Sequence, residues 1–396
     1  MTRISIILLL LVSLAHLLAS TNGAPTATPT KYIITLKPTV NQHLFTRSLH
    51  AELAASAESA SLNRIHDEYS IADHFKAYTG TFSPSIIAKL RQHSAVEAIE
   101  PDGIVHAFGT GGSKRQDNPL SWGLARVSQR ENPKYPGAYV YPAHGGDGVD
   151  VYVIDTGIMA NHTDFEGRAS HAWSAVKSWP ETDDNGHGTH VASTIAGRLH
   201  GLAKRSRLHG VKVLSATGSG SIFGVLGGIR FVADQAQRQG NKTVIANMSL
   251  GGAFNFAVNR AVAAAARVGV MFAFAAGNEA GDACDVSLAS SPYGVTVAAG
   301  VRNETVAWFS NWGRCVDVIA PGFNITAAYI DGGVETWSGT SMASPHVAGA
   351  LALILANDPM QTPEQVKAKL LSATTNGTIQ GDLRETPNRV LYVQPE

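Results

Sequence analysis

The sequence predicts an α/β protein in which a mostly parallel sheet carries helices on both faces and is preceded by a small α+β domain. From residue 120 onward, apolar segments rich in β-branched residues alternate with segments of helical periodicity, which is typical of a covered parallel sheet. Residues 31–106 instead contain two strand–helix–strand halves, the pattern of a split βαβ sandwich. The chain has 396 residues, 44% of them hydrophobic, which is enough to form both units.

Residues 1–21 have the organisation of a secretory signal peptide. Arg3 precedes an apolar run at residues 4–12, and the small residues Ala19-Ser20-Thr21 precede a cut expected between residues 20 and 24. The alternative is a membrane anchor, but the run is too short for one and no second hydrophobic span follows. We therefore expect a secreted protein, with the medium, a cell wall and a vacuole all open as destinations.

The small domain, residues 25–106, begins with a loose segment at residues 25–30. We expect strands at residues 32–36, 73–82 and 96–100, and helices at residues 46–60 and 85–93. Ser83 and Pro84 mark the start of the second helix, because serine caps free N–H groups and proline suits the first helical position. Residues 107–119 then form an exposed linker in which Lys114-Arg115 is a candidate site for a processing protease.

The large domain, residues 120–396, supplies the parallel sheet. Strands are expected at residues 149–155, 208–214, 244–249, 270–275, 295–299 and 315–320. Helices are expected at residues 190–198, 222–239, 254–268 and 341–356, the third with Phe254, Val258, Ala261, Val262 and Ala265 on one face. Folds of this kind place their sites at the carboxyl ends of the strands, so polar residues there are the candidates for chemistry.

Asp155 and His187 are the first two candidates. Asp155 ends the strand VDVYVID at residues 149–155, although a turn-forming aspartate gives the same pattern. His187 lies between glycines in DNGHGTH at residues 184–190, and it can act as a general base if Asp155 holds its second ring nitrogen. The alternatives are a loop histidine or a metal held by His187 and His190, but the glutamate of a His-Glu-x-x-His zinc helix is absent.

Ser341 and Asn278 complete the constellation. Ser341 lies in GTSMASPHVAG at residues 339–349, where a helix begins at the serine and its free N–H can bind an oxyanion. Taken alone, this serine could be a helix N-cap. Asn278, in AAGNE at residues 275–279, follows an apolar strand, so its amide can donate a second hydrogen bond, although a turn asparagine is the simpler interpretation.

The chain order of aspartate, histidine and serine is the most specific feature. An α/β-hydrolase runs serine, acid, histidine, and the only histidine after Ser341 is His346 within the same expected helix, so that fold is excluded. The segments that carry these motifs resemble the subtilisin family of serine proteases, in its proteinase K-like branch, over about residues 120–396. Residues 31–106 resemble the inhibitory prosegment of that family, including YTGTFS at residues 78–83 and AIEPD at residues 98–102.

The resemblance implies a subtilisin-like serine endopeptidase (EC 3.4.21) behind a ferredoxin-like prodomain that blocks the cleft until it is cut. Asp155, His187 and Ser341 are then the triad, and Asn278 belongs to the oxyanion hole. It implies an extended peptide substrate bound by Gly218, Ser219, Gly220, Ser249, Leu250 and Gly251. The S1 pocket is then walled by residues 249–251 and by Ala275 and Gly277, without a buried charge, so we expect a broad preference for apolar or aromatic P1 residues.

The same resemblance implies a structural calcium ion held by the carbonyls of Pro292 and Gly294 and the carboxylate of Asp317. An aspartate in a strand is the alternative for Asp317. Cys284 and Cys315 are the only two cysteines, and a secreted chain with an even count pairs them. Candidate glycan acceptors are Asn161, Asn241, Asn303, Asn324 and Asn376.

The expected partners follow from the charge and from the resemblance. The formal net charge is zero, so neither nucleic acid nor an anionic membrane is expected as the main partner. We expect a monomer that binds protein and peptide substrates, with its own prosegment as an intramolecular inhibitor. Two other functions stay open: a catalytically silent binding protein of the same fold, and a general esterase or lipase. No triad member is substituted, which disfavours the first, and the chain order disfavours the second.

Overall fold

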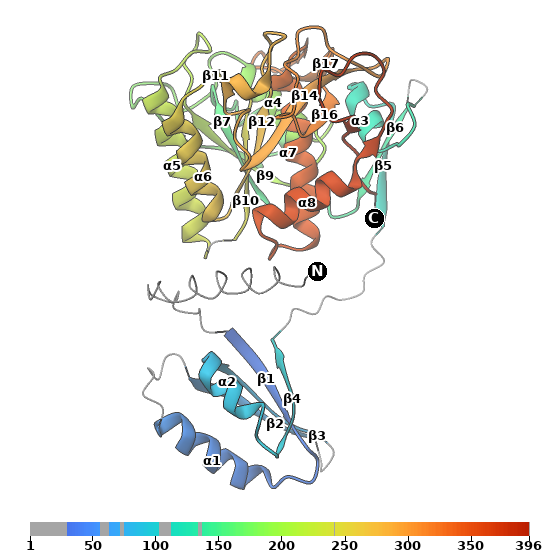
Figure 1. Ribbon diagram of the computed structural model, residues 1–396. Helices are drawn as coiled ribbons and strands as arrows, with labels where there is room; N and C mark the ends of the chain where they lie inside the picture. The colour runs from blue at the N-terminus through green and yellow to red at the C-terminus, as the bar shows by residue number, and fades with distance from the viewer. Residues whose placement is uncertain are drawn as a thin grey trace, which may run out of the picture. The chain divides into compact units, whose positions relative to one another are not determined.

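The protein is described by a computed structural model over residues 30–55, 63–71, 75–102, 112–133, 137–240 and 242–395. The chain divides into two compact units, residues 1–108 and 109–396 (Figure 1). The predicted signal peptide lies outside the described residues. Within the described ranges, no helix is long and apolar enough to cross a membrane.

The small unit has the predicted split βαβ architecture. Its elements, in chain order, are β1 (Thr30–Leu36), α1 (Gln42–Ala55), β2 (Arg64–Ile71), β3 (Phe75–Phe82), α2 (Pro84–Leu90) and β4 (Val96–Pro101). They form one antiparallel sheet of order β2-β3-β1-β4, whose core includes Ile34, Tyr78 and Ile86. The hydroxyl of Ser83 accepts a hydrogen bond from the backbone N–H of Ile86, as expected of an N-cap.

Strand β2 was not predicted, because its sequence RIHDEYSI has little apolar character. It lies at the edge of the sheet, and most of its described side chains are exposed. An edge strand is held by main-chain pairing on one side, which requires no apolar pattern.

The large unit is built on a ten-stranded sheet whose main path runs β19-β20-β16-β14-β12-β10-β7-β9-β8. The pairs from β20 to β8 are parallel, as predicted. The strands of this path are β7 (Asp150–Asp155), β8 (Ala169–Ser174), β9 (Arg207–Lys212), β10 (Val244–Met248), β12 (Val270–Ala275), β14 (Gly294–Val301), β16 (Val318–Pro321), β19 (Thr375–Asn376) and β20 (Arg389–Val390).

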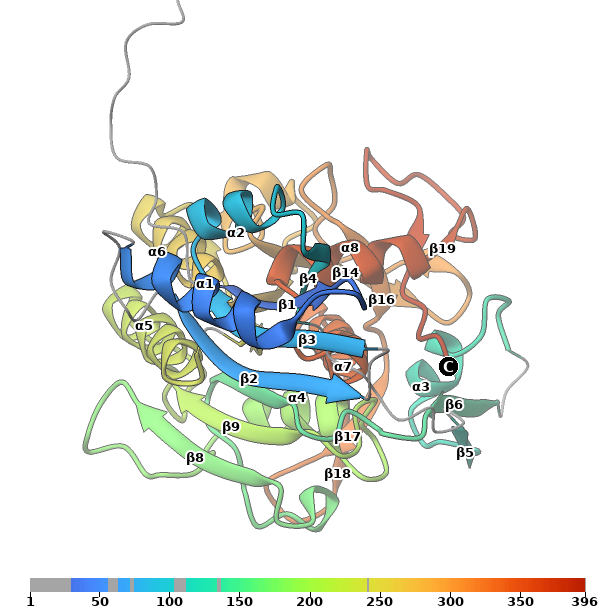
Figure 2. The ribbon, with the colours of Figure 1, turned by 90° about the horizontal axis from the view of Figure 1, so that it is seen from below.

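Helices cover both faces of this sheet. They are α3 (Trp122–Val127), α4 (His187–Ala196), α5 (Ile222–Arg238), α6 (Phe256–Arg267), α7 (Thr340–Asn357) and α8 (Pro363–Ala373). The remaining short elements are β5 (Ser113–Asp117), β6 (Ala138–Pro142), β11 (Gly252–Ala253), β13 (Val286–Ser287), β15 (Thr305–Val306), β17 (Ile325–Ala328), β18 (Val334–Trp337) and two 3-10 turns, Thr163–Phe165 and Ala283–Asp285. Helices α5 and α6 lie side by side in both ribbon views (Figures 1 and 2).

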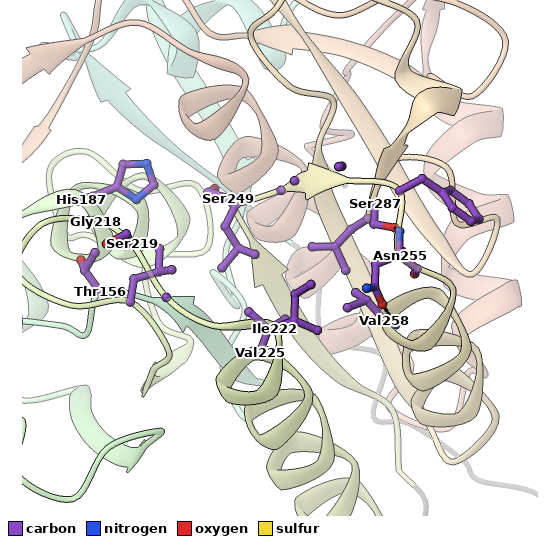
Figure 3. A pocket seen from close by; sticks show the side chains of 18 of the residues that line it. Thr156, His187, Gly218, Ser219, Ile222, Val225, Ser249, Asn255, Val258 and Ser287 are labelled. Carbon is purple, nitrogen blue, oxygen red and sulfur yellow. Dashed lines mark hydrogen bonds between the residues drawn. The ribbon is translucent and has the colours of Figure 1, made fainter.

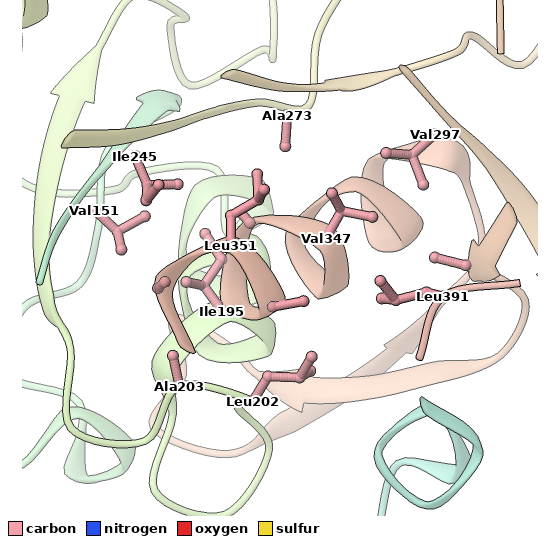
Figure 4. Close-up of a cluster of buried hydrophobic side chains, with 14 of the residues drawn as sticks. Val151, Ile195, Leu202, Ala203, Ile245, Ala273, Val297, Val347, Leu351 and Leu391 are labelled. Atoms are coloured by element: carbon pink, nitrogen blue, oxygen red, sulfur yellow. The ribbon is translucent and has the colours of Figure 1, made fainter. Parts of the chain in front are cut away.

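Alternate residues of each buried strand pack into two separate cores. In β7, Val151 and Val153 face the core built with α3, α4, α7 and α8, where Leu351 of α7 also lies (Figure 4). Tyr152 and Ile154 face the opposite core, built with α5 and α6. A strand buried on both faces is apolar throughout, which is why the parallel strands could be predicted from apolar runs.

Two predictions for this unit need correction. Phe254 was placed on the apolar face of a helix, but it precedes α6 and is 57% exposed, whereas Val258 and Val262 are buried as expected. Within the predicted linker, residues 113–117 form strand β5, which pairs antiparallel with β6. Pairing of this kind uses main-chain groups, so a segment without apolar side chains can still form a strand.

Cys284 and Cys315 form a disulfide with a Cα–Cα distance of 5.3 Å, as predicted. The bond joins the segment after β12 to the segment before β16, across 31 residues of sequence. A cross-link stabilises the folded state chiefly by restricting the unfolded chain, more so for a longer loop.

Replacing both cysteines by serine is expected to lower the free energy of unfolding by about 3–4 kcal/mol, on the chain-entropy scale for a loop of this length. Denaturant unfolding would measure this loss, with Ser341→Ala protein as the parent so that the protease activity expected from the sequence cannot digest the sample. The control is reduction by dithiothreitol, which should shift the midpoint of the parent but not that of the double variant. Equal midpoints for parent and double variant would contradict the prediction.

Candidate active site

Asp155 and His187 come together at the carboxyl end of β7. The Asp155 side chain is fully buried, and its Oδ1 lies 2.7 Å from Nδ1 of His187 and accepts a second bond from the Thr156 N–H. A carboxylate can only accept, so this contact makes Nδ1 the protonated nitrogen and leaves Nε2 free to act as a base. The contact between the two residues is the one that the sequence predicted.

Asp183 holds the loop that carries His187, and sequence reasoning did not identify it. Its carboxylate is buried and accepts hydrogen bonds from the N–H groups of Asn185, Gly186 and Thr189 at 2.9–3.0 Å. It also accepts from the hydroxyls of Thr156 and Thr189. Because five donors converge on one side chain, the loop has little freedom and the ring of His187 is pre-positioned.

The glycine on the N-terminal side of His187 is needed for its conformation. Gly186 has φ 107°, a left-handed value that a larger residue rarely adopts, and a Cβ there would collide with the ring of Tyr329. A tight turn therefore places His187 at the first position of α4.

His190 is not available as a metal ligand through Nε2. That nitrogen lies 3.1 Å and 3.2 Å from the carbonyls of Ile325 and Glu335, and its ring stacks on Trp337 with centroids 5.1 Å apart. Burial lowers the pKa of His190 to about 4, so the ring stays neutral. No group of three or more metal-binding side chains occurs in the part of the chain that the structure describes. The geometry therefore favours a base over a metal ligand for His187.

The pKa of His187 sets the expected pH dependence of the site. Burial lowers this pKa, but the charge of Asp155 and its hydrogen bond more than offset that effect and raise the pKa above the ordinary 6.5. A histidine must be neutral to accept a proton, so if His187 is the predicted general base, kcat/KM should fall on acidification with an apparent pKa above 6.5.

Nuclear magnetic resonance titration of His187 in Ser341→Ala protein would measure this pKa directly. Asp155→Asn should move the midpoint to lower pH, because burial lowers this pKa and the two larger raising effects, the charge and the hydrogen bond of Asp155, are then lost. The control is Asp117→Asn, an exposed aspartate paired with Arg115, which should leave the midpoint unchanged. An unchanged midpoint in Asp155→Asn would be inconsistent with the assignment.

Ser341 lies in the first turn of α7, beside the loop that follows β10. Its hydroxyl donates to the carbonyl of Ser249 at 3.1 Å, and the hydroxyl of Ser249 donates back to the carbonyl of Ser341. Among the described residues, no hydrogen bond joins Ser341 Oγ to the ring of His187. Catalytic hydrogen bonds are often long or poorly aligned without substrate and tighten only when it is bound, so this contact of the Ser341 hydroxyl is compatible with the predicted triad.

Asn278 is held by its amide oxygen, and its NH₂ group has no hydrogen-bond partner among the residues that the structure describes. Its Oδ1 accepts hydrogen bonds from both the backbone N–H and the hydroxyl of Thr340 at 2.9 Å. A backbone N–H cannot donate to an NH₂ group, so these contacts determine which amide atom is oxygen. Nδ2 is therefore available to donate beside Ser341, as an oxyanion hole requires.

Asn311, which sequence reasoning did not identify, supports the loop that carries Asn278. It is buried; its Oδ1 accepts from the N–H groups of Glu279 and Gly281, and its Nδ2 donates to the carbonyl of Ala276. Asn311 lies in the stretch FSNWG, residues 309–313, which is one of the segments that resemble the subtilisin family. This resemblance is the one feature of the sequence that could have pointed to Asn311.

The predicted substrate-binding residues line two neighbouring cavities. One is lined by Gly218, Ser219, Gly220, Ser249, Leu250 and Gly251 together with His187, and it reaches the apolar residues Ile222, Val225 and Val258 (Figure 3). The other is lined by Ala275, Gly277, Asn278 and Ser341, and shares Leu250 and Gly251 with the first. Glu279 also lines the second cavity; this residue is exposed, and its carboxylate accepts a hydrogen bond from Asn311 Nδ2.

Comparison with known proteins agrees with this geometry. The model of the subtilase family matches residues 146–387, which is more than half of the chain. The chain belongs to the subtilase family. The model of peptidase inhibitor I9 matches residues 31–108, so this subtilase carries an I9 prosegment.

Individual relatives support the assignment. The subtilisin-like proteinase Spm1 of Pyricularia oryzae is 38% identical, over 94% of this chain and 78% of its own length. Cerevisin of Saccharomyces cerevisiae is 41% identical, over 85% of this chain and 56% of its own. A solved cold-adapted subtilisin-like serine proteinase is 44% identical with a TM-score of 0.65, covering 69% of this chain and 97% of that one. The chain is therefore a subtilisin-like serine protease.

Subtilases often bind calcium, and the three predicted ligands of this one do lie together. The position between them, however, holds the side-chain ammonium of Lys367. Its Nζ lies 3.4 Å from the carbonyl oxygen of Pro292, 2.5 Å from that of Gly294 and 3.0 Å from Asp317 Oδ2. An ammonium and a calcium ion cannot share one position, so these residues do not fit the predicted metal.

Proposed function

We propose that this subtilase is a secreted endopeptidase in which Ser341 is the nucleophile, His187 the general base and Asp155 the residue that orients it. The observation that carries the proposal is the 2.7 Å contact between His187 Nδ1 and Asp155 Oδ1; His187 lines one cavity, and Ser341 and Asn278 line the second cavity, which shares Leu250 and Gly251 with the first. His187 Nε2 takes the proton of Ser341 as Oγ attacks the scissile carbonyl, and later delivers it to the leaving amine. The N–H of Ser341 and Nδ2 of Asn278 bind the oxyanion.

Covalent labelling tests this assignment. A phosphonyl fluoride should label Ser341 of the processed protein rapidly, because the reagent requires an activated serine. Ser338→Ala, which removes a nearby exposed hydroxyl, should be labelled at the same rate, and Ser341→Ala should not be labelled. No labelling of the processed parent would favour a catalytically silent binding protein. Labelling without peptide hydrolysis, but with ester hydrolysis, would favour an esterase.

We further propose a broad preference for apolar or aromatic P1 residues. The second cavity has small apolar walls, Ala275 and Gly277 among them, and its one carboxylate, Glu279, belongs to an exposed residue that is already hydrogen-bonded to Asn311. Peptide substrates that differ only at P1 provide the test. Faster cleavage after Phe or Leu than after Arg is expected, and much faster cleavage after Arg would contradict the proposal.

We propose that the I9 prosegment inhibits the enzyme until the chain is cut on the N-terminal side of β5. Lys114 and Arg115 pair with β6, and a protease must bind its substrate as a free extended strand, so a cut after Arg115 would require β5 to detach. N-terminal sequencing of processed protein should find a start before Ser113. An intact Ser341→Ala precursor would indicate self-cleavage, whereas a start at Gln116 would show that another protease cuts after Arg115.

A further inference from the structure

The side-chain ammonium of Lys367 occupies the position that the sequence assigned to a calcium ion. Lys367 lies in α8, and its Nζ is within hydrogen-bond distance of the three oxygens that the sequence assigned to calcium. We call Pro292, Gly294 and Asp317 the 292–317 cradle. Both charged side chains are largely enclosed, with 22% of Lys367 and 23% of Asp317 exposed. The contact is therefore a part of the packed structure rather than a loose surface pair.

The cradle lies at the amino ends of the strands. Gly294 is the first residue of β14 and Asp317 immediately precedes β16, and these strands pair in parallel. Asp317 Oδ2 also accepts a hydrogen bond from the N–H of Thr296 at 2.9 Å, which ties it to the neighbouring strand. Asp155 lies at the carboxyl end of β7 in the same sheet. A change in the cradle should thus affect stability without altering the triad.

The number of hydrogen-bond acceptors in the cradle suits an ammonium. A lysine ammonium has three N–H donors and no acceptor, and the cradle offers two carbonyl oxygens and one carboxylate oxygen. Its single negative charge is balanced by one lysine. Calcium takes six to eight oxygens, and the cradle supplies three in the contacts seen around Nζ. The three donors of Lys367 can therefore be satisfied without further ligands, whereas a calcium ion would need several waters.

We propose that Lys367 is a built-in cation that replaces calcium in this subtilase, so that the amino end of the sheet is held together without a metal ion. The tethered ammonium is always present at its site, whereas a free ion must be captured from solution. The stability of this region should therefore be insensitive to chelators. The proposal does not depend on the proposed activity, because its test uses full-length Ser341→Ala protein as the parent.

Removing the ammonium should create a calcium site. In EGTA, Lys367→Ala is expected to lower Tm by about 2–6 °C, because the half-buried carboxylate of Asp317 loses the positive charge that balances it. Calcium chloride should restore that loss, since the shortened side chain leaves room for an ion and its waters. Calorimetric titration should find one more calcium per chain in Lys367→Ala than in the parent. Lys369→Ala, an exposed lysine of the same helix, is the matched control and should behave as the parent.

Two outcomes would overturn the proposal: equal calcium stoichiometry for the parent and Lys367→Ala, or no loss of Tm in Lys367→Ala. If Lys367→Ala does not fold in EGTA but folds in calcium chloride, this rescue by calcium supports the proposal. If Lys367→Ala folds neither in EGTA nor in calcium chloride, Lys367→Met is tested instead, because methionine keeps most of the aliphatic part of the side chain. That variant should be less stable than Lys369→Met and gain no calcium site, and equal Tm values would contradict the proposal.

Discussion

Ser341→Ala is expected to lower kcat by roughly 10⁶-fold, the scale of the loss that removal of the nucleophile causes in subtilisin itself. Alanine has no oxygen to form the acyl-enzyme, so the two-step route is closed and only the oxyanion hole and substrate binding remain. KM should change little, because the cleft residues that would hold the peptide, such as Gly218 and Ser249, are untouched. Stability should also change little, since within the described residues the hydroxyl makes one hydrogen bond, to the Ser249 carbonyl.

The measurement is hydrolysis of a peptide substrate by purified protein freed of its prosegment by an added protease. Ser338→Ala is the control, since it removes an exposed hydroxyl three residues earlier and should retain activity. A second arm combines Ser341→Ala with His187→Ala. Triad members act as a unit, so the double variant should be no slower than the single. Losses that multiply would show that the two residues act independently and would contradict a shared proton transfer.

The elements that could be predicted are those whose signals are local. Asp155 ends an apolar strand, His187 lies between glycines, and Ser341 begins a long apolar helix, so each could be placed from a short window of sequence. Parallel strands buried on both faces, such as β12, appear as apolar runs and were predicted at their observed bounds. The contact between Asp155 and His187 follows that local placement, because the loop after a parallel strand lies at the same edge of the sheet as the strand's carboxyl end.

What could not be predicted depends on contacts between residues far apart in the chain. Asn311 holds the Asn278 loop from about 30 residues away, and Lys367 contacts Asp317 across 50 residues. The hydrophobic periodicity of a sequence does not predict which distant side chain will contact a given residue in the fold. Helix α8, which carries Lys367, did have a local signal that went unused: Thr362 and Gln365 form a capping box around Pro363. A predicted α8 would still have left the position of its lysine unknown.

Asn278→Ala is expected to lower kcat by roughly 10²–10³-fold, the loss found on removing the corresponding donor of subtilisin. The reason is geometric. Thr340 binds Oδ1 of Asn278 through both its N–H and its hydroxyl, which leaves Nδ2 as the donor for the oxyanion. KM should hardly change, because this bond strengthens only as the carbonyl oxygen becomes negative. Steady-state kinetics on one peptide substrate would separate kcat from KM.

Thr340 is a positioning residue for Asn278, because its N–H and its hydroxyl both donate to Asn278 Oδ1. Thr340→Val keeps the backbone bond to Oδ1 but loses the hydroxyl, which also accepts a hydrogen bond from the N–H of Gly277. We expect a loss in kcat of about tenfold, the scale of one ordinary hydrogen bond, and recovery in Thr340→Ser. If Thr340 acts by orienting the amide, Thr340→Val should cost nothing further once Asn278 is alanine. A loss of the same size in both backgrounds would instead assign Thr340 a role in packing, because no amide would then remain for it to orient.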